Sequence, residues 1–433
     1  MPIQDSNQPT FWWNVVPDNR ADEWDQLIAG RSVYMTSSYL KAMEGHPEVE
    51  TRLAVWAATS SAGEDSARIT GAVVFQRVLI ESRAPAGHLK LGWIMRRVNS
   101  ILHPGGRPLT FSAWVAGQSL ASGPHAHIFE PGLTDLEAAR RVDSAFRQLA
   151  QKSRASAWIL KDQLPGAGLS LCKMRRRGWT ELSFDPVMIV PLQSDWHGIE
   201  DWMDALRTKA RSKVKSILHR SGGVDLEELD ALQAEEMADV LYGLYCAVYD
   251  RASVVMGGLA PGDFARLKRE HGQDFRLVAY RIEGRVVGFQ CGLCSTPTAG
   301  NTRTIEAYFV GFEPACNKEM GLYQRMLVEF VRWGIDRDAS RVIMGRTALE
   351  IKSGIGALPI PLTLAVRFRH PVLRLLMAMT GHLLVAKPFV PRRAWREEAA
   401  RIWTDRGAET GYLGREGDGK AGLSSDHLRD PVN

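Results

Sequence analysis

Glu306, Tyr308 and Lys352 are the side chains of this sequence that are best placed for chemistry at a carbonyl group. Glu306 and Tyr308 stand in the apolar run TIEAYFVGF, and side-chain alternation along a strand predicts that they share one face with Val310. Lys352 follows a second apolar run, RVIMG, where α/β sheets place ligand-binding groups. These residue types would supply a general base, an acid for a leaving group, and a positive charge for an oxyanion or phosphate. Such a set favours an enzyme.

Each of the three residues also has a structural alternative. Tyr308 would pack in the core with its hydroxyl bonded, and Glu306 would form a structural ion pair. Lys352 would be a surface lysine that caps a backbone carbonyl. The burial and the partners of these side chains distinguish the two interpretations.

A polar corner, NKEMG at 317–321, follows the first apolar run and precedes an amphipathic segment. Asn317 is predicted to be the N-cap of a helix through that segment, which leaves the next backbone amides free for an anion. Together with Lys318 and Gly321, these amides would hold a phosphate or pyrophosphate. Arg346 would clamp an anion through two parallel hydrogen bonds.

A basic helix is predicted between Asp204 and Asp225, where the sequence has no acidic residue. Apolar residues at helical spacing give this segment one buried stripe, and its outer face is basic. A solvated surface is the simplest interpretation. The alternatives are an acyl carrier protein, a tRNA backbone or an anionic lipid surface as partner. The basic residues are Arg207, Lys209, Arg211, Lys213, Lys215 and Arg220.

Other motifs point less strongly to chemistry. Cys291 and Cys294 form a CxxC inside a predicted strand, where an odd spacing turns the two side chains to opposite faces. His125 and His127 share a strand face, but no third ligand stands nearby, and no metal site is predicted. The G-x-S-x-G elbow of serine hydrolases does not occur in the sequence.

Composition fits a globular protein of two or three domains. The chain has 433 residues, 45% of them hydrophobic, a net charge of +5 and five unevenly spaced cysteines. No apolar run is long enough to span a membrane, and the first residues do not read as a secretory signal. A cytoplasmic location is therefore expected. The apolar segment PVLRLLMAMTGHLLV, which starts at residue 371, would close the core or rest on the inner membrane surface as a peripheral contact.

The order of elements predicts a repeated architecture. Strands paired early and alternating with helices later occur once in each half, which predicts a mixed α/β fold with a central sheet flanked by helices in each unit. The expected units are 1–195 and 196–400, with the probable donor site in the second. The Gly- and Asp-rich segment 401–433 is predicted to be a disordered tail.

These residues carry a resemblance to a known family. The text GFEPACNKEMGLYQRMLVEFVRWGIDRDASRVIMGRTALEIKSGIGA is similar to the GNAT fold of N-acyltransferases, and the duplication resembles the Fem-type (FemAB-like) branch. In that branch an L-x-x-x-R helix follows the junction between units, and here the similar segment from Leu206 to Arg211, with one residue more between its leucine and arginine, leads the basic helix. Its core ends with text similar to the residues at Gly345, Arg346, Lys352, Gly356 and Ala357.

The resemblance implies an enzyme that moves an acyl or aminoacyl group from a thioester or a tRNA ester to a primary amine. The acceptor would be a cell-envelope or polysaccharide precursor, and no tightly bound cofactor would be needed. Acyl-CoA, acyl carrier protein and aminoacyl-tRNA are the candidate donors. The corner at 317–321 has one glycine and no arginine, unlike the pyrophosphate loop of ordinary GNAT enzymes, which disfavours free acyl-CoA. The alternative function is a non-catalytic nucleic-acid or envelope-binding module that uses the basic helix.

Overall fold

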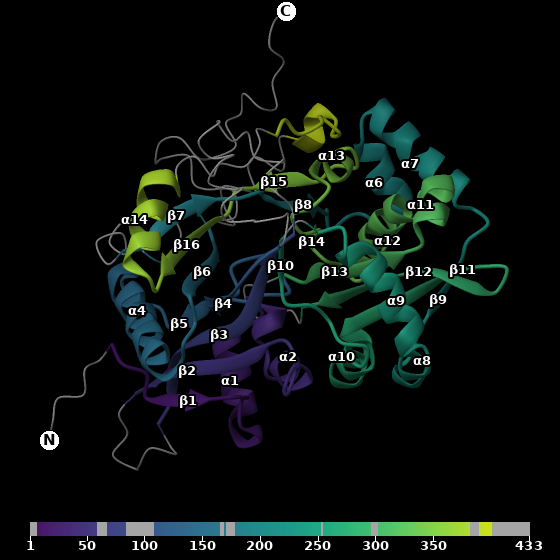
Figure 1. The fold of residues 1–433 in the computed structure, drawn as a ribbon. Coiled ribbons are helices and arrows are strands. Elements are labelled where there is room, and N and C mark those ends of the chain that lie inside the picture. Colours follow the sequence, from purple (N-terminus) through teal and green to yellow (C-terminus); the bar gives the residue numbers. More distant parts are fainter. Residues whose placement is uncertain are drawn as a thin grey trace, which may run out of the picture.

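The computed structural model describes residues 7–58, 67–83, 108–164, 169, 178–252, 254–295, 302–381 and 389–400. Two mixed β-sheets, each flanked by helices, form the two halves of the molecule (Figure 1). The predicted mixed α/β class with two tandem units is confirmed. The predicted tail 401–433 lies outside the described residues.

The first sheet is built around one parallel pair of strands. Its order is β1 (Phe11–Trp13), β2 (Glu50–Ala57), β3 (Ile69–Ser82), β4 (Leu109–Ala116), β6 (Ala157–Gln163), β16 (Thr363–Phe368) and β7 (Thr180–Ser183). β5 (His127–Phe129) and β10 (Val254–Met256) also pair with β3. β4 and β6 run parallel, with residues 113–116 paired to residues 157–160.

Helices cover both faces of this first sheet. α4 (Asp135–Lys152) begins at a capping box between Thr134 and Glu137 and packs Val142 and Phe146 against one face. The opposite face packs against α1 (Ala21–Ile28) and α2 (Ser37–Ala42). Short 3-10 turns, η1 (Asp18–Arg20) and η2 (Val33–Met35), flank α1.

The second sheet also holds one parallel pair. Its order is β15 (Leu358–Ile360), β8 (Val187–Pro191), β14 (Arg341–Ile343), β13 (Thr304–Phe312), β12 (Arg285–Cys294), β11 (Phe275–Ile282) and β9 (Asp225–Glu228). β13 and β14 run parallel over residues 304–306 and 341–343. The packing on either side differs, because the two faces carry different helices.

One face packs against α6 (Ile199–Ala205), α7 (Thr208–Arg220) and α12 (Leu322–Asp336). The apolar stripe of α12 is buried and consists of Leu322, Met326, Phe330 and Val331. The other face packs against α8 (Ala231–Glu236), α9 (Ala238–Tyr249) and α10 (Asp263–His271), which the 3-10 turn η5 (Gly272–Asp274) follows. The described residues also form α11 (Pro314–Met320), α13 (Leu349–Ser353) and α14 (Pro371–Thr380).

Three strands lie in the sheet of the other predicted unit, taking the predicted boundary between residues 195 and 196. β8 precedes the boundary but lies in the second sheet, while β10 and β16 follow it and lie in the first sheet. A division into 1–195 and 196–400 therefore remains a proposal for the units and does not apply to these strands. The exchange of strands ties the two halves together through backbone hydrogen bonds.

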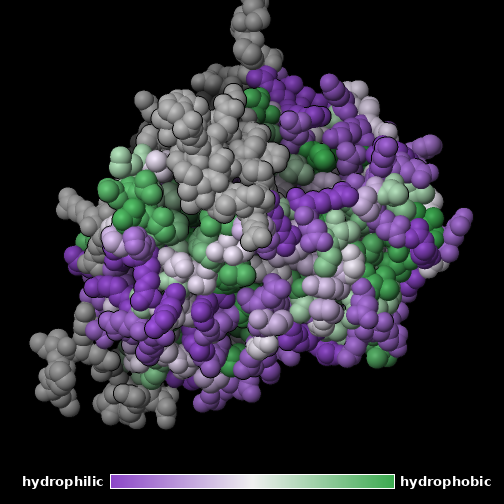
Figure 2. All heavy atoms as spheres, viewed as in Figure 1, coloured by the Kyte–Doolittle hydropathy of each residue, from purple (hydrophilic) through white to green (hydrophobic). Residues whose placement is uncertain are grey.

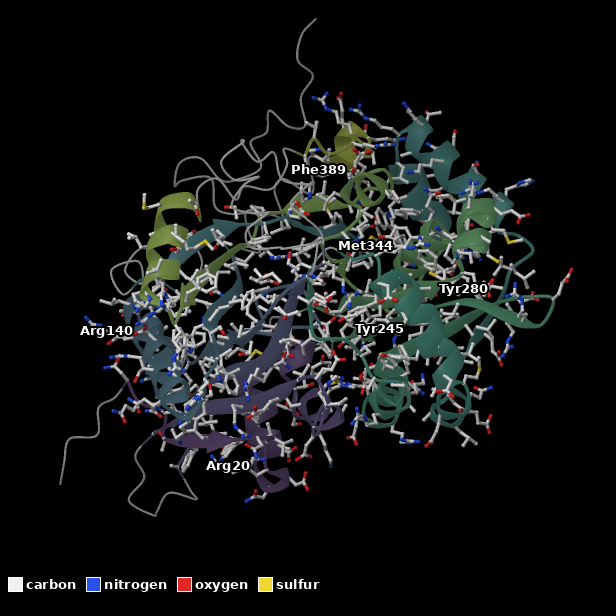
Figure 3. The ribbon with its side chains drawn as sticks, in the orientation of Figure 1. Arg20, Arg140, Tyr245, Tyr280, Met344 and Phe389 are labelled. Atoms are coloured by element: carbon white, nitrogen blue, oxygen red, sulfur yellow. The ribbon has the colours of Figure 1, made fainter. Side chains whose placement is uncertain are left out.

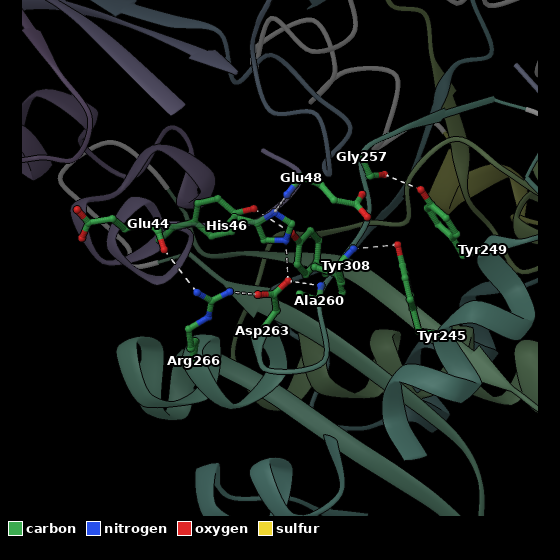
Figure 4. Close-up of polar contacts among 12 residues, drawn as sticks. Glu44, His46, Glu48, Tyr245, Tyr249, Gly257, Ala260, Asp263, Arg266 and Tyr308 are labelled. Atoms are coloured by element: carbon green, nitrogen blue, oxygen red, sulfur yellow. Dashed lines mark hydrogen bonds and ion pairs between the residues drawn. The ribbon is translucent and has the colours of Figure 1, made fainter. Parts of the chain in front are cut away.

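A buried polar cluster adds side-chain contacts between the halves (Figure 4). His46 Nε2 lies 2.9 Å from Asp263 Oδ2, and the Glu48 amide donates to His46 Nδ1 at 3.1 Å. Asp263 also accepts from the Ala260 amide and pairs with Arg266. Both nitrogens of the imidazole are thus engaged, so this histidine holds two elements together and is not available as a base.

Candidate active site

In each of the two parallel strand pairs, the two strands are hydrogen-bonded over only part of their length and then separate. We call the point of separation a fork. In the first fork, β4 ends at Ala116 while β6 continues to Gln163. In the second fork, β13 continues to Phe312 after its last pair with β14, between Glu306 and Ile343. Beyond Ile343 the chain follows β8 instead, because Met344 and Gly345 bond to Met188. Met344 is labelled at this point in Figure 3.

A β-bulge in β13 sets the directions of the predicted side chains. Phe309 pairs with Cys291 and Ala307 pairs with Gly292, so Tyr308 is an extra residue in the ladder. Glu306 is paired with Leu293, on the face that packs against α8–α10. Val310 pairs with Gln290 and lies on the opposite face. The prediction that Val310 shares the face of Glu306 is therefore wrong, because the bulge resets the alternation.

Glu306 is a buried carboxylate at the second fork. Only 6% of the residue is exposed, and among the described residues its side chain has no hydrogen-bond partner. Burial raises the pKa of Glu306 to about 8, although the charge of Arg341 acts in the opposite direction. The predicted alternative, a structural ion pair, would have given a lower pKa and a direct partner.

The side chain of Tyr308 contacts residues of the first unit. Its hydroxyl lies 2.8 Å from the Tyr39 hydroxyl, and its ring lies 5.5 Å from the ring of Tyr34. Burial, together with the two tyrosine neighbours, raises the pKa of Tyr308 well above its ordinary value. The phenol therefore stays protonated and acts as a hydrogen-bonding group. The charge of Glu306 contributes to the raised pKa of Tyr34, which places this carboxylate beside the same cluster of rings.

Lys352 lies on α13, past the end of β14. The residue is 2% exposed, and burial lowers the pKa of its amine to about 7. Its Nζ lies 4.0 Å from the position that a Cβ on Gly345 would take. No hydrogen-bond partner of Nζ occurs within the described ranges. The predicted surface lysine is thus excluded in favour of a buried amine.

Glu306 and Lys352 do not form an ion pair. Arg341 is the charge that affects the pKa of Glu306, and burial alone accounts for that of Lys352. The two residues instead stand on the two strands that part at the second fork, on β13 and beyond β14. Each is a buried ionisable group with no direct ion-pair partner among the described residues.

The polar corner at 317–321 differs from the prediction. The segment forms two helices, because α11 ends at Met320 and Gly321 adopts a left-handed conformation with φ 70° before α12. The amides of residues 318–320 belong to α11, so the prediction that they are free N-terminal amides is wrong. Asn317 lies inside α11, so its predicted role as the N-cap is wrong, although its Oδ1 accepts from the Tyr323 amide of α12 at 2.9 Å.

The same corner lies against the end of the basic helix. A Cβ on Gly321 would collide with the guanidinium of Arg220, and Arg220 also donates to Gln324 Oε1 at 3.2 Å. Lys318 is exposed on α11. The structure therefore brings Lys318, Gly321 and Arg220 together at one surface.

Arg346 is engaged with the first unit. Its guanidinium forms an ion pair with Asp162, and Lys161 Nζ lies 2.6 Å from the same carboxylate. The Gly123 amide also donates to Asp162 at 2.9 Å. Arg346 Nε is buried and has no partner among the described residues. This arginine thus links the two forks. Only the guanidinium nitrogens that do not contact Asp162 remain for the predicted role of Arg346 as an anion clamp.

The basic helix α7 is observed over Thr208–Arg220, close to its predicted bounds. Arg211 pairs with Asp204 at 3.1 Å, and Arg207 Nε donates to the Trp395 carbonyl at 2.9 Å. Lys209 and Lys215 are exposed. Part of the basic charge is therefore structural, and part faces solvent.

The sequence prediction missed Tyr34 and Tyr39 and considered His125 only as a metal ligand, whereas the first unit contributes all three to this region. The rings of Tyr34 and His125 lie 4.8 Å apart, and His125 Nδ1 lies 2.9 Å from Ser32 Oγ. Nothing local in their sequence signals the contact, because it depends on how the two units pack.

The described residues contain no group of three or more His, Cys, Asp or Glu side chains with the geometry of a metal site. Cys291 and Cys294 lie in different core clusters, on opposite faces of the sheet, as predicted. Burial raises the pKa of these two thiols to about 12 and 11. In the part of the chain that the structure describes, no helix has both the length and the apolar character needed to cross a membrane.

Comparisons with known proteins give distant similarities of fold. No family model matches the chain, and no curated protein matches it. The chain is similar to the solved structure of FemX, with 10% identity, 85% of this chain and 100% of that chain covered, and a TM-score of 0.48. It is also similar to a tandem GNAT protein from the clavulanic acid biosynthesis pathway, with 11% identity, coverage of 82% and 97%, and a TM-score of 0.46.

A third similar structure is the C-terminal domain of a putative lysylphosphatidylglycerol synthetase from Agrobacterium fabrum. The identity is 11%, the coverage is 86% of this chain and 98% of that chain, and the TM-score is 0.42. Likenesses at this distance assign no activity or substrate to the chain. The chemistry therefore has to be argued from its own residues.

Proposed function

We propose that this protein is an N-acyltransferase that moves an acyl or aminoacyl group from an activated donor to a primary amine. The observation that carries the proposal is a pair of buried ionisable groups at the second fork, Glu306 and Lys352, which have no partner in the part of the chain that the structure describes. Burying such groups without a partner destabilises a fold, so their presence is explained best by substrates that supply the missing charges.

Glu306 is proposed as the general base. The acceptor arrives as an ammonium ion, whose positive charge beside Glu306 lowers the raised pKa of the carboxyl group and favours the carboxylate. The carboxylate then takes one proton from the nitrogen, and the neutral amine attacks the carbonyl carbon of the donor. A pKa close to the working pH suits a group that must both take up and release this proton.

Lys352 is proposed to stabilise negative charge. When the amine attacks, the carbonyl oxygen of the donor becomes an oxyanion, and a buried ammonium attracts it more strongly than an exposed one would. An anion at this position raises the lowered pKa of Lys352 and keeps it charged. Collapse of the adduct forms the new amide bond and breaks the bond to the thiolate or ribose oxygen.

Tyr308 is proposed to assist the leaving group. Its hydroxyl pair with Tyr39 fixes the direction of the phenol. Because the raised pKa keeps the proton in place, Tyr308 would donate a hydrogen bond to the departing sulfur or oxygen.

The donor is proposed to bind from the side of the α11–α12 corner. Lys318 and the exposed residues of α7 are basic and would attract the phosphates of coenzyme A, of a phosphopantetheine carrier or of tRNA. Asn317 and Gly321 would shape the corner, and Arg346 would contribute its remaining nitrogen atoms. All three donors are cytoplasmic species, so we place the reaction in the cytoplasm, with a cell-envelope or polysaccharide precursor as the acceptor.

The proposal is tested by supplying purified protein with acyl-CoA, acyl carrier protein and aminoacyl-tRNA pools and a mixture of amine acceptors. Mass spectrometry is expected to detect a new amide with at least one donor class. Lys352→Met should lower the rate at least about 100-fold, because a preorganised oxyanion ligand is lost. The control is Lys41→Met at an exposed lysine, which should leave the rate unchanged.

A non-catalytic binding module is the competing function, and the exposed charge of α7 is its motive. In that case no donor gives a Lys352-dependent product, while the protein binds RNA with an affinity that falls steeply with salt. That combination would overturn the enzyme assignment.

A further inference from the structure

The C-terminal helix α14 (Pro371–Thr380) is held on the first sheet by one side only. It packs on β16 and β7, with Arg374 against Gly178 and Met377 near Gly381. None of its residues is buried. The inner side of this helix thus contains Arg374 and Met377, and most of its large apolar residues lie on another side.

The apolar stripe of α14 faces solvent. Val372, Leu375, Leu376 and Met379 recur at the spacing i, i+3, i+4, i+7, which normally marks the face that a helix turns to the core. These four residues and Leu373 are between 41% and 62% exposed. Figure 2 shows hydrophobic residues gathered on the surface at this helix. An apolar stripe turned outward indicates that something outside the described residues covers it.

The charge around the stripe indicates what that partner is. The sequence has no acidic residue between Glu350 and Glu397. Arg369 and His370, at the start of α14, are both exposed. A surface that combines an apolar stripe with basic residues matches the boundary between the headgroups and acyl chains of an anionic bilayer.

A second copy of the chain fits this surface less well. The exposed apolar side chains belong to one helix of ten residues, which presents a single small surface patch. A stable interface between proteins needs about 800 Å² from each partner. The helix is also too short to span a bilayer, because ten residues extend only about 15 Å.

We propose that α14 docks the protein onto the surface of an anionic lipid bilayer. The helix lies in the plane of the interface, with Val372, Leu375, Leu376 and Met379 among the upper acyl chains. Arg369 lies at the level of the phosphates. The docking uses a different part of the molecule from the second fork, so it stands apart from the proposed transfer reaction.

The test is co-sedimentation of the full chain with vesicles of phosphatidylcholine containing 30% phosphatidylglycerol, at about 50 mM salt. The wild-type protein is expected to sediment with these vesicles and far less with pure phosphatidylcholine. Leu375→Ser with Met379→Ser should lower the partition coefficient at least about fivefold, because two apolar anchors are lost. Arg369→Gln should weaken binding to the anionic vesicles and leave the small neutral component unchanged.

A matched control replaces apolar residues that are equally exposed elsewhere. Leu232→Ser with Val240→Ser, on the second unit, should leave vesicle binding unchanged. Thermal unfolding of each variant shows whether it is folded. Failure of the folded wild-type protein to sediment overturns the proposal, as does equal binding of the α14 variant. A wild-type dimer in light scattering that the α14 variant dissociates would show a contact between copies instead.

Discussion

The two forks contain the same kinds of residue in opposite electrostatic situations. At the first fork, Lys161 and Asp162 are buried but paired with each other, and Arg346 completes the cluster. Burial alone would raise the pKa of Asp162, yet the two neighbouring cations hold it below its ordinary value. At the second fork, Glu306 and Lys352 are buried and have no partner among the residues that the structure describes. Burial raises the pKa of Glu306 to about 8 and lowers the pKa of Lys352 to about 7.

The comparison of the two forks distinguishes buried charges that stabilise the fold from buried charges that await a substrate. A buried ion pair is satisfied within the fold and has no need of a ligand. A buried carboxylate and a buried amine that lack partners destabilise the folded protein, and a substrate with complementary charge would restore the balance. The comparison therefore predicts opposite responses to equivalent substitutions at the two forks.

The largest expected effect is on turnover. Glu306→Gln should lower kcat by about 10²–10⁴-fold, because the base is removed while the shape is kept. The control is Glu329→Gln, since Glu329 is as buried as Glu306 but paired with Arg325 and Arg332. Steady-state kinetics of both variants should show the loss for Glu306 alone. Similar losses at both positions would mean that burial, and not the missing partner, accounts for the effect.

Breaking the ion pairs of Asp162 with Lys161 and Arg346 should lower the stability of the protein. Asp162→Asn is expected to lower the free energy of unfolding by about 3 kcal/mol, because Lys161 and Arg346 lose their counter-charge. Asparagine tolerates the left-handed backbone at this position, where φ is 57°, so the change isolates the charge. Urea unfolding measures the effect. Asp204→Asn, at an exposed ion pair, should change stability by less than about 0.5 kcal/mol, and equal losses at the two sites would contradict the comparison.

Removing the amine of Lys352 should increase the stability of the protein, in contrast to the loss expected for Asp162→Asn. Lys352→Met is expected to raise the free energy of unfolding at pH 7 by on the order of 2 kcal/mol, because the buried amine no longer has to be desolvated. The folded pKa of Lys352 lies below the unfolded value, so the penalty is full below about pH 7 and fades as the pH rises toward 10. Lys161→Met should destabilise the protein, since Asp162 then loses a partner. A loss of stability in both variants would argue that Lys352 has a structural partner.

A smaller effect concerns buried groups that are neutral. Burial lowers the pKa of His125, His127 and His271 to about 4. Unfolding at acidic pH therefore takes up protons, and stability should be full above about pH 6.5 and fall as the pH approaches 4. Urea unfolding at pH 7 and pH 5 should show a decrease of on the order of 1 kcal/mol per histidine. In His271→Gln, the decrease in the free energy of unfolding should be smaller by the contribution of one histidine. If the pH dependence of the variant equals that of the wild type, His271 does not take up a proton on unfolding.

Much of the second fork could be predicted from sequence, because its signals are local. The strands around Glu306 and Arg341 show as apolar runs, and Lys352 follows the second of them at a strand end. Its burial was not predicted, since it depends on packing against residues that are distant in the chain. The prediction assigned these side chains to the ends of two strands but could not give their environment.

The errors have identifiable physical causes. The bulge at Tyr308 arises from the register with β12, which no pattern within β13 contains. The break at Gly321 was missed although Pro314 marks the start of a helix and Gly321 a helix end. The strand exchange among β8, β10 and β16 and the contact between Tyr39 and Tyr308 are long-range features. Such features follow from tertiary packing and leave no periodic trace in the sequence.

The pH dependence of the effect of Glu306→Gln tests the central claim most directly. The ratio of the wild-type kcat/KM to that of the variant cancels the titration of the acceptor and of Lys352, and it follows the ionised fraction of Glu306. We predict that this ratio rises about tenfold per pH unit below pH 8 and levels off above it, because the pKa of Glu306 is about 8. A ratio that stays constant between pH 6 and 9 would contradict the assignment of Glu306 as the base.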